Sequence, residues 1–318
     1  MGTLATEVKW RACLRFLNMG SLVAPMTFEK RDGCMKKINA LEAFVIALSM
    51  LAAPLLAHAN GDGQFIIRCS YDHSLPDDPI VFPQLPAASH LHDFLGALTT
   101  NAFSSYASMR AGGTNCSTPD DTAGYWTPAL YRNGVLIEPR GTGPTGINVR
   151  PKIYYSNTNL LLGTRVEPLP ADLRIIAGNG HAASPSENPK LGKEIYWGCS
   201  DNSTSKLIAP PASCATGIIS LHVGFPNCWD GVLTHKNDTA HLAYPSGGVC
   251  KAPFIRPLPR VILRWEYPVG INTGIIALSS GPTYTAHGDF WNTWNQERLN
   301  SLNESCINKN VRCGTLTK

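Results

Sequence analysis

The sequence predicts a mostly β fold: a single sandwich- or jelly-roll-like domain, stapled by disulfides, with a few short helices. Short runs rich in β-branched and aromatic residues recur along the chain, each bounded by Gly, Pro, Asn or Asp, as strands between turns are. The 24 prolines and 28 glycines are spread through the chain, which disfavours long helices. Eight cysteines after residue 60 supply the predicted disulfides.

The predicted strands can be placed in order along the chain. They are FIIRC (65–69), VLIEP (135–139), KIYYS (152–156), LRIIAG (173–178), EIYWGC (194–199), GIISLHVGF (217–225) and RVILRWEYP (260–268). Two segments instead favour helices, at 91–110 and at 289–307, with Asp289 as the N-cap of the second. There is no internal repeat or linker, so residues 60–318 are expected to form one domain.

The first 59 residues carry the pattern of a processed leader. Lys36 and Lys37 follow Met35, an apolar run occupies 43–56, and Ala57-His58-Ala59 fits a small-x-small cleavage site. The run is shorter than the roughly 20 apolar residues that span a bilayer, although an uncleaved anchor is the alternative reading. The sequence therefore predicts a non-native upstream extension at 1–34, a signal peptide at 35–59, and a secreted or periplasmic mature chain without a membrane span.

The cysteines of the mature chain predict disulfides. They are Cys69, Cys116, Cys199, Cys214, Cys228, Cys250, Cys306 and Cys313. An even number behind a signal peptide indicates up to four disulfides formed in an oxidising compartment. Spacing does not fix the pairing, but we expect sequential neighbours, with Cys306 and Cys313 closing the smallest loop.

Charge and motifs exclude several classes of function. Residues 60–318 hold 20 Lys and Arg against 19 Asp and Glu, so they show no basic excess for a nucleic acid to bind. The serine elbow G-x-S-x-G and the zinc motif H-E-x-x-H do not occur. If the cysteines form disulfides, they cannot act as nucleophiles. Three possibilities then remain for the function: catalysis by carboxylates, a metal site built from histidines, or no catalysis at all.

The stretch SHLHDF, residues 89–94, is the strongest candidate for a site. On a strand, His90 and His92 share one face and Asp93 lies on the other. The two histidines suit a divalent transition metal, copper or zinc, with a carboxylate as third ligand or as a partner of a ligand. The alternative is a buried hydrogen-bonded knot, in which Asp77 and Asp78 bind backbone N–H groups of a turn.

Two later blocks repeat this chemistry. In TAHGDF, His287 and Asp289 stand two residues apart, and His287 is the freer group if Asp289 caps a helix. In FPNCWDG, Trp229 beside Asp230 suits contact with a sugar, but equally suits packing on a disulfide next to a turn.

These blocks give the following candidate residues. The metal ligands are His90, His92 and His287; the catalytic residues are His92, Asp93, Asp230 and Asp289; and the ligand-binding residues are Asp78, His222, Trp229 and His241.

The same blocks resemble a known family. DDPIVFPQLPAASHLHDFLG, YWTPALYRNG, FPNCWDG, HLAYPSGGVC and LSSGPTYTAHGDFWNTWN occur in the order found in domain of unknown function nineteen-ninety-six. The resemblance implies a secreted protein of fungi or bacteria, with a single large domain and a shared His/Asp pattern, but no particular reaction. Members usually carry a glycine-rich turn where this chain has Leu85 and Ala87, so a loop that needs φ > 0 would have to relax here.

Two functions fit the sequence. In the first, an exported protein with a His/Asp site acts on or binds an envelope or extracellular polysaccharide, with a divalent metal. In the second, it is a non-catalytic structural or glycan-binding module of the envelope, whose histidines are buried hydrogen-bond partners. Aromatic residues would then form part of the hydrophobic core and a flat surface on which a glycan could stack. These are Tyr125, Trp126, Trp229, Trp291 and Trp294. The sequence does not decide whether the protein is an enzyme.

Overall fold

The computed structural model describes residues 62–201, 205–233 and 239–317. The predicted extension at 1–34 and the predicted signal peptide at 35–59 lie outside the described residues. No helix within the described ranges is both long enough and apolar enough to cross a bilayer.

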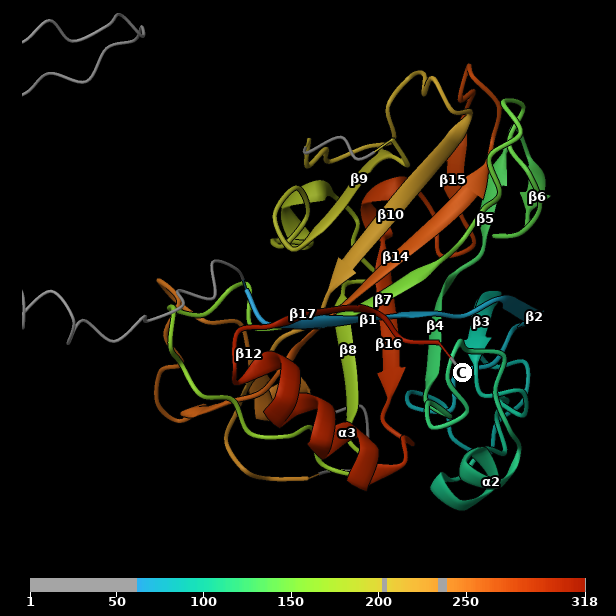
Figure 1. Ribbon diagram of the computed structural model, residues 1–318. Coiled ribbons are helices and arrows are strands. Elements are labelled where there is room, and N and C mark those ends of the chain that lie inside the picture. The colour runs from blue at the N-terminus through green and yellow to red at the C-terminus, as the bar shows by residue number, and fades with distance from the viewer. Residues whose placement is uncertain (1–61, 202–204, 234–238, 318) are drawn as a thin grey trace, which may run out of the picture. The chain divides into compact units, whose positions relative to one another are not determined.

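Two large β-sheets make up most of the fold. The first has the order β17 (Arg312–Thr315), β1 (Gln64–Arg68), β7 (Lys152–Ser156), β14 (Arg260–Pro268), β10 (Ile218–Gly224) and β9 (Ile195–Cys199). The second has the order β2 (Tyr71–Leu75), β3 (His92–Gly96), β4 (Gly124–Pro128), β16 (His287–Trp291) and β8 (Arg174–Gly178). In Figure 1, β10 and β14 run diagonally side by side, whereas β8, β16 and β4 run more steeply.

Smaller elements complete the chain. Two three-stranded sheets have the orders β12 (Leu242–Ala243), β11 (Cys228–Trp229), β13 (Arg256–Pro257) and β15 (Ile276–Leu278), β5 (Leu130–Arg132), β6 (Val135–Ile137). The helices are α2 (Tyr106–Ala111) and α3 (Gln296–Leu302), with single turns η1 (Pro185–Glu187), η2 (Thr239–His241), η3 (Thr283–Thr285) and η4 (Asn303–Ile307).

The main core lies between the two large sheets. Inward-facing side chains of the six-stranded sheet, among them Ile67, Ile153 and Leu263, share one cluster with Tyr125 and Phe290 of the five-stranded sheet. Alternate residues of each strand face this cluster, as the two-residue period of a strand requires. The predicted mostly β, disulfide-stapled sandwich is therefore confirmed, and so is a short helix near the C-terminus.

The seven strands predicted from the sequence all form, but the two predicted helices do not have the predicted extent. Residues 91–110 contain strand β3 and only a six-residue helix, α2. Residues 289–307 begin as strand β16, and α3 starts at Gln296 with Asn295 as its N-cap, the side chain accepting from the Arg298 N–H. Asp289 is therefore a strand residue, and the prediction that it caps a helix is wrong.

The five-stranded sheet is covered on both faces. A second apolar cluster packs on the face that points away from the main core, and it contains Phe94, Trp126 and Trp291 together with Ile80 from the loop before β3. Every residue of β3, β4 and β16 is consequently buried. Polar side chains on this second face are thus largely surrounded by packed protein.

Four disulfides join sequential cysteines, as expected from the sequence. They are Cys69–Cys116, Cys199–Cys214, Cys228–Cys250 and Cys306–Cys313. The smallest loop closes over a sequence separation of 7, and the largest over 47. Cross-links of this kind stabilise chiefly by limiting the unfolded chain.

The loop before β3 keeps a left-handed backbone. Ala87 has φ 57° and Gln84 has φ 66°, so the prediction that this loop would relax is wrong. The Asp77 carboxylate accepts hydrogen bonds from the N–H groups of Ala87 (2.8 Å) and Ala102 (2.9 Å), which fixes the loop in place.

Replacing Ala87 by glycine should therefore raise the free energy of unfolding by about 0.5–1 kcal/mol, because glycine adopts φ > 0 without steric cost. Urea denaturation of the purified protein measures the change. Ala88→Gly is the matched control, since Ala88 lacks a positive φ, and we expect it to lower stability slightly. Equal effects of the two substitutions would contradict the assignment of strain to Ala87.

Candidate metal centre

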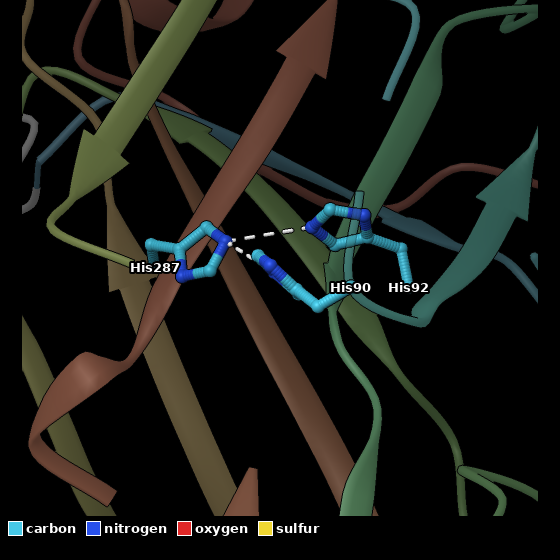
Figure 2. Close-up of side chains that lie close together, drawn as sticks. All are labelled: His90, His92 and His287. Carbon is cyan, nitrogen blue, oxygen red and sulfur yellow. Dashed lines mark hydrogen bonds between the residues drawn. The ribbon is translucent and has the colours of Figure 1, made fainter. Parts of the chain in front are cut away.

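Three histidines meet at the outer face of the five-stranded sheet. His90 Nε2 lies 3.1 Å from His287 Nε2, and His92 Nε2 lies 3.4 Å from the same atom. Figure 2 shows His287 pointing from one side toward His90 and His92 on the other. His92 and His287 are buried and His90 is half-buried. The sequence left open whether these side chains meet, and the structure brings them together.

Strand register explains the meeting of residues so distant in sequence. β3 and β16 both pair with β4, and His92 lies opposite Pro128 in that central strand. Asp289 of β16 lies opposite Trp126 of β4 in an antiparallel pair. Two residues further along each strand, His287 therefore lies opposite the same proline. The two histidines therefore flank Pro128 on one face of the sheet, and His90 reaches them from the loop before β3.

Backbone carbonyls fix the protonation of two of these rings. His92 Nδ1 lies 2.9 Å from the Asp77 carbonyl oxygen, and His287 Nδ1 lies 2.8 Å from that of Thr285. A carbonyl oxygen only accepts, so each Nδ1 carries the hydrogen and each neutral ring presents a lone pair at Nε2. A metal-binding histidine is typically oriented by a hydrogen bond from the ring nitrogen that does not bind the metal. The Nδ1 hydrogen bonds of His92 and His287 to backbone carbonyls are of this kind.

The spacing of the Nε2 atoms fits a single small cation. Ligand nitrogens at about 2.0–2.1 Å from a tetrahedral ion lie about 3.3–3.4 Å from one another. The separations of 3.1 and 3.4 Å agree with that geometry, and the three ligand atoms lie within 4.8 Å of each other.

Burial keeps the three rings neutral. It lowers the pKa of His287 to about 3, and together with nearby His181 it lowers the pKa of His90 to about 4. The pKa of His92 is well below its ordinary value because of burial first and then the other two histidines. Neutral imidazole is the form that binds a metal, so the ligands are ready at neutral pH.

Two carboxyl groups lie beside the histidines. Asp289 faces the same side of β16 as His287, and neither of its carboxyl oxygens has a hydrogen-bond partner among the described residues. Burial first, and then the charge of Asp78, raises the pKa of Asp289 well above its ordinary value. The carboxyl of Asp78 accepts from the N–H groups of Ile80 and Val81, and burial raises its pKa to about 6.

Asp78, His92 and Asp289 also offer ligand atoms within 4.8 Å of one another. This second group shares His92 with the three-histidine cluster, so the two groups form one continuous polar site. A third group of potential ligands, Cys69, Cys116 and Asp121, offers no thiolates, because its two cysteines form a disulfide.

A small cleft opens onto the site. Its volume is about 280 Å³, and its lining includes His90, His287, Asp289, Asp78 and the exposed His181. A Cβ added at Gly180 would lie 2.8 Å from His287 Cε1, so the lack of a side chain there leaves room for the imidazole. Water and a small ligand can thus reach the cluster from one side.

Asp93 lies on the opposite face of β3 from His92, as the strand period predicts. Its carboxyl accepts from the Ser74 hydroxyl at 2.6 Å and lies 3.5 Å from the Tyr267 hydroxyl, between the two sheets. Burial raises its pKa to about 7. Asp93 is therefore not brought to the histidine cluster.

Three other predicted residues lie together in a different part of the fold. Trp229, in the small sheet around β11, donates its ring N–H to the Val232 carbonyl and is covered by the Arg256 guanidinium 4.5 Å from its ring centre. Asp230 follows it and lies 2.6 Å from His241 Nδ1. These residues form a local turn with a hydrogen-bonded histidine–aspartate pair and contribute nothing to the histidine cluster.

His222 lies on the six-stranded sheet, in β10. Its ring stacks on Tyr196 with centroids 4.4 Å apart, and its Nε2 lies 3.2 Å from the Ser220 hydroxyl. The predicted aromatic platform is absent from the described surface, because Tyr125, Trp126, Trp229, Trp291 and Trp294 are each at most 6% exposed.

Sequence reasoning missed the groups that orient the ligands. The carbonyl oxygens of Asp77 and Thr285 have no sequence signature, because any residue supplies one. Gly180 and His181 belong to the loop NGHA (179–182), which follows strand β8. Gly178 and Gly180, on either side of Asn179 at the end of that strand, were the available signal.

The fold and the site define a disulfide-bonded β-sandwich with three convergent histidines on the outer face of one sheet. The family described as Domain of unknown function (DUF1996) matches residues 78–294, a range that includes all three histidines and both neighbouring carboxyls, and this chain belongs to it. No match was found among the curated proteins or among the solved structures.

Proposed function

We propose that this is an exported metal-binding protein that holds one divalent transition ion, zinc or copper(II), on His90, His92 and His287. The observation that carries the proposal is the pair of Nε2 lone pairs on His92 and His287, which face each other at 3.4 Å. The four disulfides support a location in an oxidising compartment.

A purely structural hydrogen-bonded knot explains this arrangement less well. Only His90 can supply a proton at Nε2, and it can donate to His287 at 3.1 Å. His92 Nε2 then faces another lone pair across 3.4 Å without a hydrogen between them. A buried acceptor left without a donor costs about 1–3 kcal/mol, whereas one cation would satisfy all three nitrogens.

The proposed site leaves a coordination position open toward the cleft. Three protein ligands plus one exchangeable water is the composition of catalytic rather than structural zinc sites. A bound ion of this kind supplies Lewis acidity and lowers the pKa of its water, and the carboxyls of Asp78 and Asp289 are placed to accept or return a proton. An extracellular polysaccharide stays the proposed substrate class, although the buried aromatic residues give it no support.

Adding metal to metal-free protein should stabilise it. At a free zinc concentration of 100 times the dissociation constant, the gain is about 2.7 kcal/mol, which raises Tm by roughly 5 to 10 °C in a chain of this size. Elemental analysis after dialysis should find one zinc or copper per chain. Mature protein that stays metal-free after incubation with either ion, with an unchanged Tm, would rule the proposal out.

A further inference from the structure

The outward face of the six-stranded sheet carries a row of cations. Arg68 of β1 lies opposite Lys152 of β7, which lies opposite Arg264 of β14. Adjacent strands are about 4.8 Å apart, and like charges directly opposite each other destabilise a sheet. Glu266 offsets part of this repulsion, through ion pairs of 3.2 Å to Arg264 and 3.7 Å to Lys152. No ion pair of Arg68 exists among the described residues.

Two adjoining clefts open beside this row. One has a volume of about 480 Å³ and the other of about 340 Å³, and both are lined by Arg68, Asn148 and Arg150. Together they form an elongated groove, which we call the basic groove. Volumes of this size suit a bound ligand, and the shared lining residues place the two arginines at the junction.

The basic groove concentrates positive charge. Arg68, Arg140, Arg150 and Lys152 line it, against the single carboxylate of Glu266. Residues 60–318 as a whole hold 20 cationic and 19 acidic side chains, so this local excess is not a property of the general surface. Arg140 pairs with Glu138 at 2.5 Å, but the guanidinium groups of Arg68 and Arg150 have no hydrogen-bond or ion-pair partner in the described part of the chain.

The positive charge at the basic groove contributes to the lowered pKa values of two side chains on this sheet, Lys152 and His222. Burial first, and then the charges of Arg264 and Arg68, lower the pKa of Lys152 against the opposing effect of Glu266. Burial first, and then Arg264 and Lys152, lower the pKa of His222 to about 3. The positive potential thus extends along the sheet from β1 to β10.

We infer that the basic groove binds an acidic polysaccharide, a chain of uronate sugars, with Arg68 and Arg150 as its carboxylate ligands. A guanidinium fork matches a carboxylate with two parallel hydrogen bonds. Ser70, Thr142 and Asn148 line the same groove and offer hydroxyl and amide groups to sugar hydroxyls.

The groove is independent of the metal centre. It lies on the outward face of the six-stranded sheet, whereas the histidines lie on the outward face of the five-stranded sheet, and the main core separates the two. Binding of a uronate chain therefore requires no metal on the histidines, and the two proposals can fail separately.

Calorimetric titration of the mature protein with oligogalacturonate tests this inference, at low salt and with a chelator present. We expect binding that weakens steeply with added salt, and that weakens at least tenfold for the fully methyl-esterified oligomer, which has the same shape without charge. The double variant Arg68→Gln plus Arg150→Gln should lose at least tenfold in affinity. His90→Ala should bind the oligomer as the wild type does.

Arg165→Gln is the matched control, because Arg165 is an exposed arginine paired with Glu304 outside the groove. It should bind as the wild type does, and thermal melts should show that all variants are folded. No binding by the wild type, equal binding of the methyl ester, or equal losses in both arginine variants would overturn the inference. Tighter binding of inorganic polyphosphate than of oligogalacturonate would overturn the assignment to a carboxylate polymer.

Discussion

His90→Ala should lower the affinity for zinc or copper(II) by about 100-fold or more, equal to about 2.8 kcal/mol. The metal-free protein should lose no more than about 1–3 kcal/mol of stability, the cost of leaving the buried His287 Nε2 without its donor. His90 is half-buried, and its one hydrogen bond among the described residues is to His287. Removing it deletes a ligand without leaving a buried carbonyl unpaired. Equilibrium competition with a chromophoric chelator measures the affinity, and urea denaturation without metal measures the stability.

The same measurements on His241→Ala provide the control. His241 is also a half-buried histidine that bonds to a side chain, the carboxyl of Asp230, but it lies in the single turn η2, away from the cluster. Its loss should leave metal affinity unchanged. If instead His90→Ala keeps full affinity, the cluster is a structural knot rather than a metal site.

Asp121→Asn should remove a large part of the pH dependence of stability near neutral pH. The Asp121 carboxyl is fully buried in the main core, where it accepts from the Tyr125 hydroxyl at 2.8 Å and from the Ala123 N–H at 3.0 Å. Tyr125 and Tyr155 hydroxyls lie 2.6 Å apart, which continues the chain of hydrogen bonds. Burial raises the pKa of Asp121 from 3.8 to about 8.

The sign of the effect follows from proton uptake. Between pH 3.8 and about 8 the folded protein keeps a proton on Asp121 that the unfolded chain has released, so stability falls as pH rises through this window. The full slope is about 1.4 kcal/mol per pH unit. Histidines with lowered pKa, such as His90 and His287, act in the opposite direction, but only below about pH 6.5, where the unfolded side chain takes up its proton.

Asp93 and Asp289 also have raised pKa values and act in the same direction, so the contribution of Asp121 is the difference between the wild type and Asp121→Asn in urea denaturation between about pH 6.5 and 8. The wild type should lose stability more steeply than Asp121→Asn, by about 1.4 kcal/mol per pH unit at the acid end of that range. The amide mimics the protonated carboxyl, since its nitrogen can donate to the Tyr125 oxygen. Asp120→Asn, whose carboxyl is 35% exposed, should leave the slope as it is. Parallel slopes for the wild type and Asp121→Asn would disprove the buried, protonated carboxyl.

Strands in which apolar and polar residues alternate, or in which β-branched residues are frequent, were predictable from the sequence. β7 and β14 have the predicted bounds. The strands that build the site were not. β3 and β16 are buried on both faces, so their sequences HDFLG and HGDFW lack the alternation that marks a half-exposed strand. β3 and the last three residues of β16 fall instead within the predicted helical segments 91–110 and 289–307, and the spacing of Phe290 and Trp294 is one that a helix also allows.

The residues of the candidate metal centre were predictable as a set, but their geometry was not. Histidine density singled out His90, His92 and His287, whereas Asp93, Asp230 and His241 belong to similar motifs and lie elsewhere. Which histidines meet depends on the order β3–β4–β16, and strand order depends on pairing between segments far apart in the chain. A local pattern contains no information about such pairing.

The separation of His90 from His287, 197 residues along the chain, has a consequence for folding. The four disulfides close loops with separations of 7 to 47, so each holds together only a local part of the sandwich. An ion on the three histidines would act as a reversible cross-link between distant parts of the polypeptide, joining β3 to β16 across the central strand. Acid or a chelator would open that cross-link while leaving every covalent one closed, so metal loading would report when β3 and β16 have both paired with β4.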